Sequence, residues 1–218
     1  MAKTKSAYVC NDCGADFVRW QGQCTECGTW NSISEVRLPS VTKQQRFDGY
    51  AGATAAKVIR LDQVDLQDVP RFSSGFAEFD RVLGGGIVPG SAILIGGSPG
   101  ACKSTLLLQI MCGLATTDKA LYVTGEESLQ QVALRANRLG LPTQNLMMLA
   151  ETNVETICQL AQQEKPRIMV IDSIQVMQMS DIQSAPGSVS QVRESAAYLT
   201  RFAKQHNVAV IMVGHVTK

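Results

Sequence analysis

One glycine-rich segment of this chain has the residue types that bind nucleotide phosphates. Gly97, Lys103 and Ser104 fit the pattern G-x-x-x-x-G-K-[ST], in which backbone N–H groups and the lysine hold phosphate oxygens and the hydroxyl binds Mg²⁺. An apolar run precedes the segment and an apolar helical pattern follows it, which is the strand–loop–helix context that the motif requires. We therefore predict an ATP site with Lys103 as a catalytic residue, formed by Gly97, Ser98, Pro99, Gly100, Ala101, Cys102, Lys103, Ser104 and Thr105.

Cys102 departs from this pattern, because it stands where the second glycine belongs. If the backbone there is left-handed, a residue with a Cβ costs roughly 1–2 kcal/mol of strain. The Cβ would also crowd the β-phosphate. We expect strongly reduced ATP binding and impaired catalysis. An alternative is that Cys102 is a reactive thiol, because helix N-termini lower the pKa of thiols.

Polar residues at the ends of three further apolar runs are candidate partners of the phosphate loop. Asp172 ends the run 168–171 and would bind Mg²⁺, as a Walker B carboxylate does. Glu126 follows the run 120–123, and we assign it as the base that orients the attacking water. Glu127 is the second choice, its favoured role being an acid at a helix N-terminus. His215 ends the run 208–213 and is either a γ-phosphate sensor or a solvated loop residue.

Four cysteines near the N-terminus have metal-ligand spacing. Two C-x2-C pairs can bring four thiolates to one tetrahedral ion, and with four ligands the role is structural. We predict zinc; the alternatives are rubredoxin-like iron and a redox dithiol pair. Gly14 and Gly28 follow the pairs, where a positive φ is expected. We expect Trp20 and Trp30 to be buried in the small core rather than exposed for stacking. The proposed ligands are Cys10, Cys13, Cys24 and Cys27.

Short Ile/Val-rich runs alternate with helical patterns in the rest of the chain, which predicts an α/β fold with a parallel sheet and helices on both faces. The expected helices are 103–115, 128–139, 154–164 and 189–206, and a further strand is expected at 146–150. We divide the chain into a four-cysteine zinc module (1–36), a linker (37–69) with a short strand near 58–61, and a core (70–218). The long connection 176–188 contains no Lys or Arg, and loops of this length tend to be functional.

Composition limits the classes of function. The 218 residues carry a formal net charge of +1, so no global field indicates a nucleic-acid or membrane binder. No apolar run reaches the roughly 18 residues of a membrane span, and the N-terminus lacks a signal-peptide pattern. We therefore expect a cytoplasmic protein without a membrane partner. In that compartment the seven cysteines are ligands or buried thiols, and Cys112 and Cys158 are expected in the core.

Together these motifs resemble the RadA (Sms) family of bacterial DNA recombination and repair proteins, and the resemblance covers essentially the whole chain. It implies a RecA-like P-loop ATPase core preceded by a rubredoxin-like zinc ribbon. By resemblance, Lys103, Ser104, Asp172 and Glu126 serve nucleotide binding and hydrolysis. The segments that carry it are the cysteine quartet with Arg19-Trp-Gln-Gly-Gln23, 71–90, Tyr122-Val-Thr-Gly-Glu-Glu-Ser128 and Val170-Ile-Asp-Ser-Ile-Gln175.

The family's activity is DNA-dependent ATP hydrolysis that drives helicase-like branch migration of recombination intermediates. The resemblance implies single-stranded or branched DNA, the RecA recombinase and a homo-hexameric ring as partners, and a DNA-facing loop after Asp172. Family members continue past the position of Lys218, so we expect a C-terminally incomplete core. One alternative is a non-enzymatic zinc-finger fragment that binds a partner or DNA. Another is a KaiC-like switch, which shares the Glu126-Glu127 pair but lacks the zinc finger.

Overall fold

A computed structural model describes residues 6–37, 60–63 and 70–215 of the chain. The larger part is built on a five-stranded sheet with the strand order β4-β8-β7-β5-β6, in which every pairing is parallel. The strands β5, β7 and β8 are buried on both faces, which explains why they are short, continuous apolar runs. The strands are β4 (Ala92–Gly97), β5 (Ala120–Thr124), β6 (Met147–Ala150), β7 (Ile168–Asp172) and β8 (Ala209–His215).

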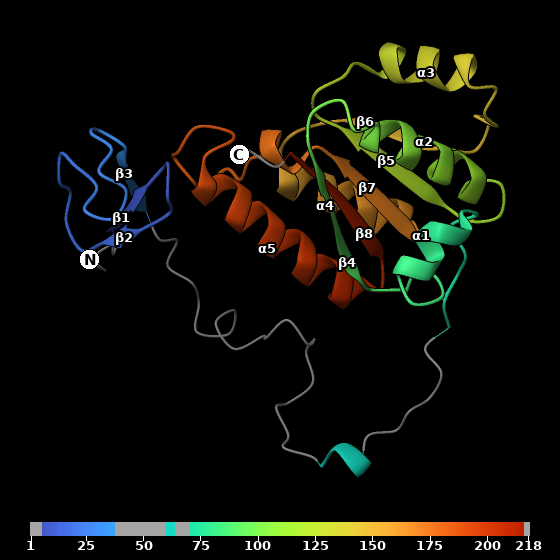
Figure 1. The fold of residues 1–218 in the computed structure, drawn as a ribbon, viewed down its shortest axis with the longest axis horizontal. Coiled ribbons are helices and arrows are strands. Elements are labelled where there is room, and N and C mark those ends of the chain that lie inside the picture. The colour runs from blue at the N-terminus through green and yellow to red at the C-terminus, as the bar shows by residue number, and fades with distance from the viewer. Residues whose placement is uncertain (1–5, 38–59, 64–69, 216–218) are drawn as a thin grey trace.

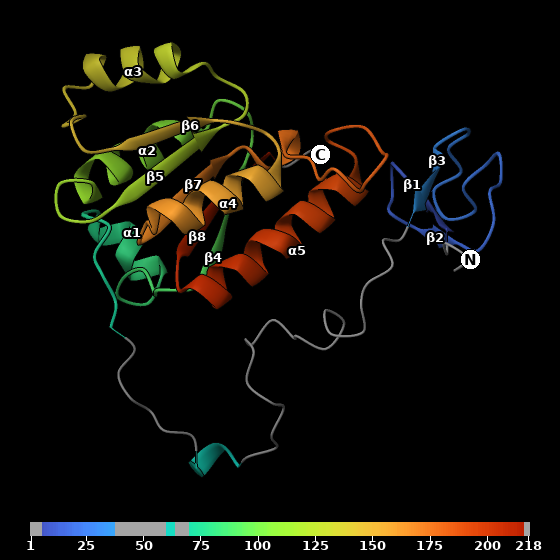
Figure 2. The same cartoon turned by 180° about the vertical axis from the view of Figure 1, so that it is seen from behind.

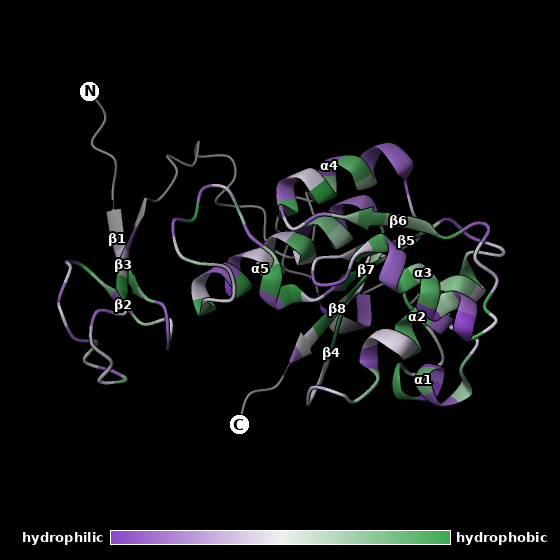
Figure 3. Cartoon of the chain, turned by 90° about the horizontal axis from the view of Figure 1, so that it is seen from above, coloured by the Kyte–Doolittle hydropathy of each residue, from purple (hydrophilic) through white to green (hydrophobic). Residues whose placement is uncertain are grey.

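Helices cover both faces of this sheet (Figures 1 and 2). One core cluster joins α2 and α3 to the sheet, and a second joins α4 and α5 to the opposite face. Green apolar residues line the strands and alternate with purple polar residues along the helices in Figure 3, as amphipathic helices require. The helices are α1 (Ala77–Val82), α2 (Lys103–Leu114), α3 (Leu129–Arg138), α4 (Val154–Glu164) and α5 (Val189–His206).

Local signals fix where three of the helices begin. Ser128 and Gln131 form a capping box at α3, in which each side chain bonds the other's backbone N–H. The side chains of Asn153 and Ser188 accept backbone N–H groups at the starts of α4 and α5. Such caps satisfy donors that have no partner inside the helix. None of the described helices has the length and apolar content needed to cross a membrane.

The N-terminal part is a small antiparallel sheet with the order β2-β1-β3. It contacts the larger part at the start of α5, where Val189 N–H donates to the Asn11 carbonyl at 3.3 Å. A Cβ at Gly14 would lie 2.9 Å from Val189 Cγ1, so the turn and the helix start pack closely. The strands are β1 (Ser6–Cys10), β2 (Asp16–Phe17) and β3 (Ile33–Arg37).

The strands and helices predicted from residue 92 onward are all present. The bounds of α4 and α5 are those expected, and the other predicted strands and helices differ by one or two residues at their ends. Helix α1 is not among the predicted elements; it has six residues and none of them is buried. Most of the linker 37–69 lies outside the described residues. A strand was expected near 58–61, and residues 58 and 59 lie outside the described residues. Leu61 is not in a strand, because it begins the 3₁₀ turn η1 (Leu61–Gln63).

A core substitution tests this packing. Leu108 lies on α2 with 1% of its surface exposed, whereas Leu134 on α3 is 69% exposed. Leu108→Ala should lower the free energy of unfolding by about 2–5 kcal/mol, because it removes buried methyl groups and leaves a cavity. Leu134→Ala should change it by less than about 0.5 kcal/mol. Urea unfolding followed by circular dichroism measures both, and equal effects would contradict the assigned burial.

Candidate nucleotide site and metal centre

Parallel pairing brings the carboxyl ends of four strands to one edge of the sheet. Gly97 of β4 pairs with His215 of β8, and Thr124 of β5 pairs with Asp172 of β7. Gly125 extends the second pairing, because its N–H donates to the Asp172 carbonyl at 2.8 Å. The phosphate loop, the Walker B carboxylate and the residues after β5 therefore meet at this edge, where ligands of open α/β sheets bind.

The glycine-rich loop 97–102 connects β4 to α2 and is held together by Lys103. The Lys103 ammonium donates to the carbonyls of Gly97 and Ser98, both at 2.9 Å. The lysine side chain is buried, so its charge is satisfied by these carbonyls. A cavity of about 260 Å³ opens beside the loop; it is lined by Gly100, Ala101, Cys102, Lys103, Ser104, Thr105, Arg135 and His215. The predicted loop residues from Gly100 to Thr105 thus share one cavity.

Cys102 has the left-handed backbone that its position in the motif predicts. Its φ is 55° and its ψ is 23°, and it directly precedes the first residue of α2. The side chain is exposed at the cavity, with Sγ 3.6 Å from the Gly100 carbonyl oxygen. A non-glycine residue in this conformation stores roughly 1–2 kcal/mol of strain. The backbone strain at Cys102 is therefore confined to the turn that orients the N–H groups of the loop.

Asp172 is held by a residue that the sequence analysis did not single out. Tyr122 of β5 donates its hydroxyl to Asp172 Oδ2 at 2.5 Å. Burial and the Asp172 carboxylate raise the pKa of Tyr122 above its usual range, while the charge of Arg135 and a hydrogen bond with Ser104 oppose that shift. The phenol therefore stays protonated and orients the carboxylate. Asp172 and Ser104 meet at this phenol, and their oxygens are the donor type that Mg²⁺ prefers.

Glu126 lies between Ser173 and His215. Ser173 Oγ donates to Glu126 Oε1, and His215 Nε2 is 3.7 Å from the same oxygen. A side chain at Gly125 would lie 2.5 Å from Val176 Cγ2, so only glycine lets the chain after β5 pass this close to η2 (Ile174–Val176). The imidazole of His215 thus lies beside the proposed base and lines the cavity, and its role as sensor or solvated residue stays a prediction.

Glu127 does not share the environment of Glu126. Its carboxylate forms an ion pair with Arg135 of α3, and its backbone N–H is bound by Thr124 Oγ1 at 3.1 Å. Its carboxylate therefore holds a cation rather than pointing to Asp172. Arg135 is absent from the predicted site, since a basic residue in the last turn of a helix is ordinarily explained by the helix dipole.

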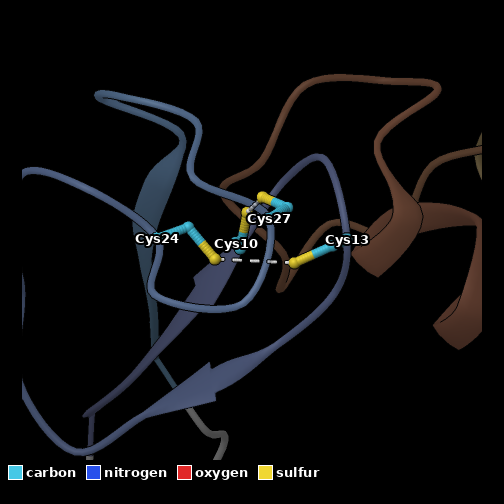
Figure 4. Close-up of side chains that lie close together, drawn as sticks. All are labelled: Cys10, Cys13, Cys24 and Cys27. Atoms are coloured by element: carbon cyan, nitrogen blue, oxygen red, sulfur yellow. Dashed lines mark hydrogen bonds between the residues drawn. The ribbon is translucent and has the colours of Figure 1, made fainter.

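The four cysteines of the N-terminal part lie together. Figure 4 shows their side chains converging from two turns, and all four Sγ atoms lie within 4.8 Å of one another. The pair Cys10–Cys27 is 3.7 Å apart and the pair Cys13–Cys24 is 3.5 Å apart. A tetrahedral ion with bonds of about 2.3 Å requires sulfurs about 3.8 Å apart. Gly14 and Gly28 have φ values of +76° and +75°, as predicted for the two turns.

The thiols of this cluster influence one another's ionisation. Burial opposes ionisation of Cys10, but hydrogen bonds from Ser32 and from backbone N–H groups outweigh it and lower its pKa to about 6. For Cys13, a backbone hydrogen bond favours ionisation, but burial and the three neighbouring cysteines raise its pKa to about 12. Four thiolates can therefore coexist here only with a cation among them. The donor set fits Zn²⁺.

Our expectation that Trp20 and Trp30 are buried is wrong. Trp20 is 57% exposed and Trp30 is 68% exposed. The small core is filled instead by Cys10, Cys24 and Ile33, with Tyr8, Ala15 and Phe17 packed against it. Because two ligands themselves occupy the core, the indoles are not needed there. Cys112 and Cys158 are buried, as predicted.

Comparison with known proteins agrees with both parts of the structure. A family model described as an AAA domain matches residues 60–218, and one described as a rubredoxin metal binding domain matches residues 8–35. The chain belongs to the AAA domain family. These matches confirm the predicted α/β P-loop core and the rubredoxin-like module with its four cysteines.

Curated relatives cover the whole chain. The chain is 70% identical to the DNA repair protein RadA of Haemophilus influenzae over 221 residues and 67% identical to that of Escherichia coli over 223 residues. It is 44% identical to the Bacillus subtilis protein of the same name over 220 residues. Each match covers 100% of this chain and 48% of the relative, so the chain spans about half the length of these proteins. The resemblance to the RadA family is confirmed.

Metal analysis tests the cysteine cluster. Purified protein should contain one zinc ion per chain by mass spectrometry, and Cys24→Ser should lose it, because three thiolates hold the ion far more weakly. Cys102→Ala is the matched control and should retain the zinc, since Cys102 lies outside the cluster. Iron in place of zinc, or full zinc content in Cys24→Ser, would contradict the assignment.

Proposed function

We propose that this chain is the DNA-dependent ATPase segment of a recombinational DNA repair protein. One observation carries the proposal: Lys103, Ser104, Asp172 and Glu126 lie at one edge of one parallel sheet. The relatives are named DNA repair proteins, which gives the biological class. By the same resemblance, ATP hydrolysis would drive helicase-like branch migration in a homo-hexamer acting with RecA.

The side chains divide the work of hydrolysis as follows. Lys103 and the N–H groups of the loop bind the β- and γ-phosphates at the positive end of α2. Ser104 and Asp172 would hold Mg²⁺, which neutralises phosphate charge when bound. Tyr122 orients Asp172. Glu126 accepts a proton from the attacking water, and Ser173 fixes the carboxylate that does so.

Single-stranded or branched DNA is the proposed second ligand, and the loop after η2 is its proposed contact. Gln191, buried in α5, orders this loop: its Oε1 accepts the Met179 N–H at 2.9 Å, and its Nε2 donates to the Ile182 and Ser184 carbonyls at 3.0 and 3.1 Å. The loop starts from the same end of β7 as Asp172. DNA bound there would act on the nucleotide site through a short, ordered segment.

Cys102→Gly should raise the affinity for Mg–ATP by about 100-fold. The gain comes from relief of crowding between the Cys102 Cβ and the β-phosphate, about 3 kcal/mol for this change in affinity. The left-handed strain is already present in this structure, so it lowers the stability of the loop rather than the affinity. Titration with a fluorescent ATP analogue measures it. Lys103→Ala in the glycine background is the control and should abolish the gain. Equal affinities of the cysteine and glycine proteins would show that Cys102 is tolerated in ATP binding.

Measurement of ATP turnover distinguishes the role of Glu126 from that of the residues that bind ATP. In the Cys102→Gly background, Glu126→Gln should lower kcat by about 10²–10⁴-fold, because it removes the base, and should leave ATP affinity within about twofold. Glu164→Gln, at the exposed end of α4, is the matched control and should keep full activity. Single-stranded DNA should stimulate the unsubstituted glycine protein. Unchanged kcat in Glu126→Gln would remove Glu126 from the mechanism.

The second candidate function is a non-enzymatic module that binds a partner or DNA through the zinc ribbon. The exposed Trp20 and Trp30 favour it, because large exposed aromatic side chains are typical of interaction surfaces. The two functions differ in one result. If the chain is a binding module, the Cys102→Gly protein should hydrolyse no ATP, with or without DNA. If it is an ATPase, the Cys102→Gly protein should hydrolyse ATP, and DNA should stimulate the hydrolysis.

A further inference from the structure

Arg135 lines the same cavity as the phosphate loop although it comes from a different helix. The cavity wall consists of residues 100–105, Arg135 and His215. Within the part of the chain that the structure describes, Arg135 and Lys103 are the two Lys or Arg residues of this wall. Lys103 already bonds two carbonyls of the loop. Arg135 therefore supplies the cavity's second positive charge from outside the loop's own sequence.

The Arg135 side chain is mostly buried in the wall of the cavity rather than exposed on the surface. Only 14% of it is exposed, whereas Arg138, one turn further on α3, is exposed to solvent. Its ion pair with Glu127 fixes the guanidinium, and Glu127 is fixed in turn by Thr124. Among the described side chains, Glu127 is its hydrogen-bond partner. A guanidinium has five N–H donors, so most of them remain free for an anion.

Phosphate is the anion that this arrangement fits. A guanidinium offers paired N–H groups in one plane, which match two oxygens of a phosphate group, and the resulting hydrogen bonds are charge-assisted. The same cavity presents the N-terminal end of α2, which also attracts anions. Arg135 shares the cavity wall with His215, which lies 3.7 Å from Glu126, the proposed base.

We propose that Arg135 binds the phosphate chain of the nucleotide from within the same subunit, and that Glu127 is the residue that positions it. This inference rests on the proposed ATPase function and deepens it. It also gives the adjacent carboxylates different tasks: Glu126 acts on water, and Glu127 holds the cation. A substitution at Arg135 should therefore weaken binding of the phosphates themselves, independent of the adenosine part.

Inorganic tripolyphosphate is the probe that isolates this contact. In the Cys102→Gly background, Arg135→Gln should weaken binding of both Mg–ATP and tripolyphosphate by roughly 10- to 100-fold, the effect of losing hydrogen bonds between charged groups. Arg135→Lys keeps the charge and should recover part of the loss. Arg138→Gln is the matched control and should bind like its parent. Isothermal titration gives the constants, and circular dichroism confirms that each variant is folded.

Glu127→Gln tests positioning. It should weaken tripolyphosphate binding, and combining it with Arg135→Gln should add little further loss, because both changes remove one interaction. If Arg135→Gln weakens ATP but not tripolyphosphate, Arg135 contacts the nucleoside and the proposal is wrong. If it weakens neither while the parent binds both, the proposal fails and the ATPase function stands. If the glycine parent binds neither ligand, the proposed function fails and this inference fails with it.

Discussion

The parallel register of four strands is the constraint on which the rest of the site depends. Because β8 lies between β4 and β7, the phosphate loop after β4 starts beside His215, and Asp172 lies one strand further along. The pairing of Thr124 with Asp172 then brings Glu126, two residues after Thr124, within hydrogen-bond distance of Ser173. A shift of one residue in either register would turn these side chains to the other face of the sheet. The buried strands β5, β7 and β8 hold the register, because a shift would remove their side chains from the core contacts that they make.

Two positions illustrate how this edge combines order with strain. Gly125 passes so close to Val176 that a Cβ would lie 2.5 Å from Val176 Cγ2, so this position is glycine for lack of space. At Cys102 the situation is the reverse. The cavity has room for the side chain, but the left-handed backbone favours glycine. The first position keeps Glu126 near Asp172. The strain at Cys102 affects the phosphate loop alone, so the fold tolerates this cysteine even if nucleotide binding does not.

The sequence was sufficient for most of the architecture, because short Ile/Val-rich runs that alternate with helical patterns indicate where the strands and helices lie. It was insufficient where a role depends on a contact between distant residues. Tyr122 is one more apolar position of a buried strand until β7 brings Asp172 to its hydroxyl. Arg135 has the pattern of an ordinary basic residue at a helix end. The indole of Trp20 was expected inside because small cores need large side chains, but the cysteine ligands fill that core themselves.

Hydrogen exchange with and without saturating Mg–ATP tests most directly whether the four strand ends form one nucleotide site. The Cys102→Gly protein avoids the weak binding expected of the cysteine. Bound nucleotide should slow exchange together in residues 97–105, 124–127, 172–175 and 213–215, because ligand contacts suppress local opening. Residues 8–35 of the ribbon should be unchanged. Protection confined to 97–105, with none at 124–127 or 172–175, would contradict the account.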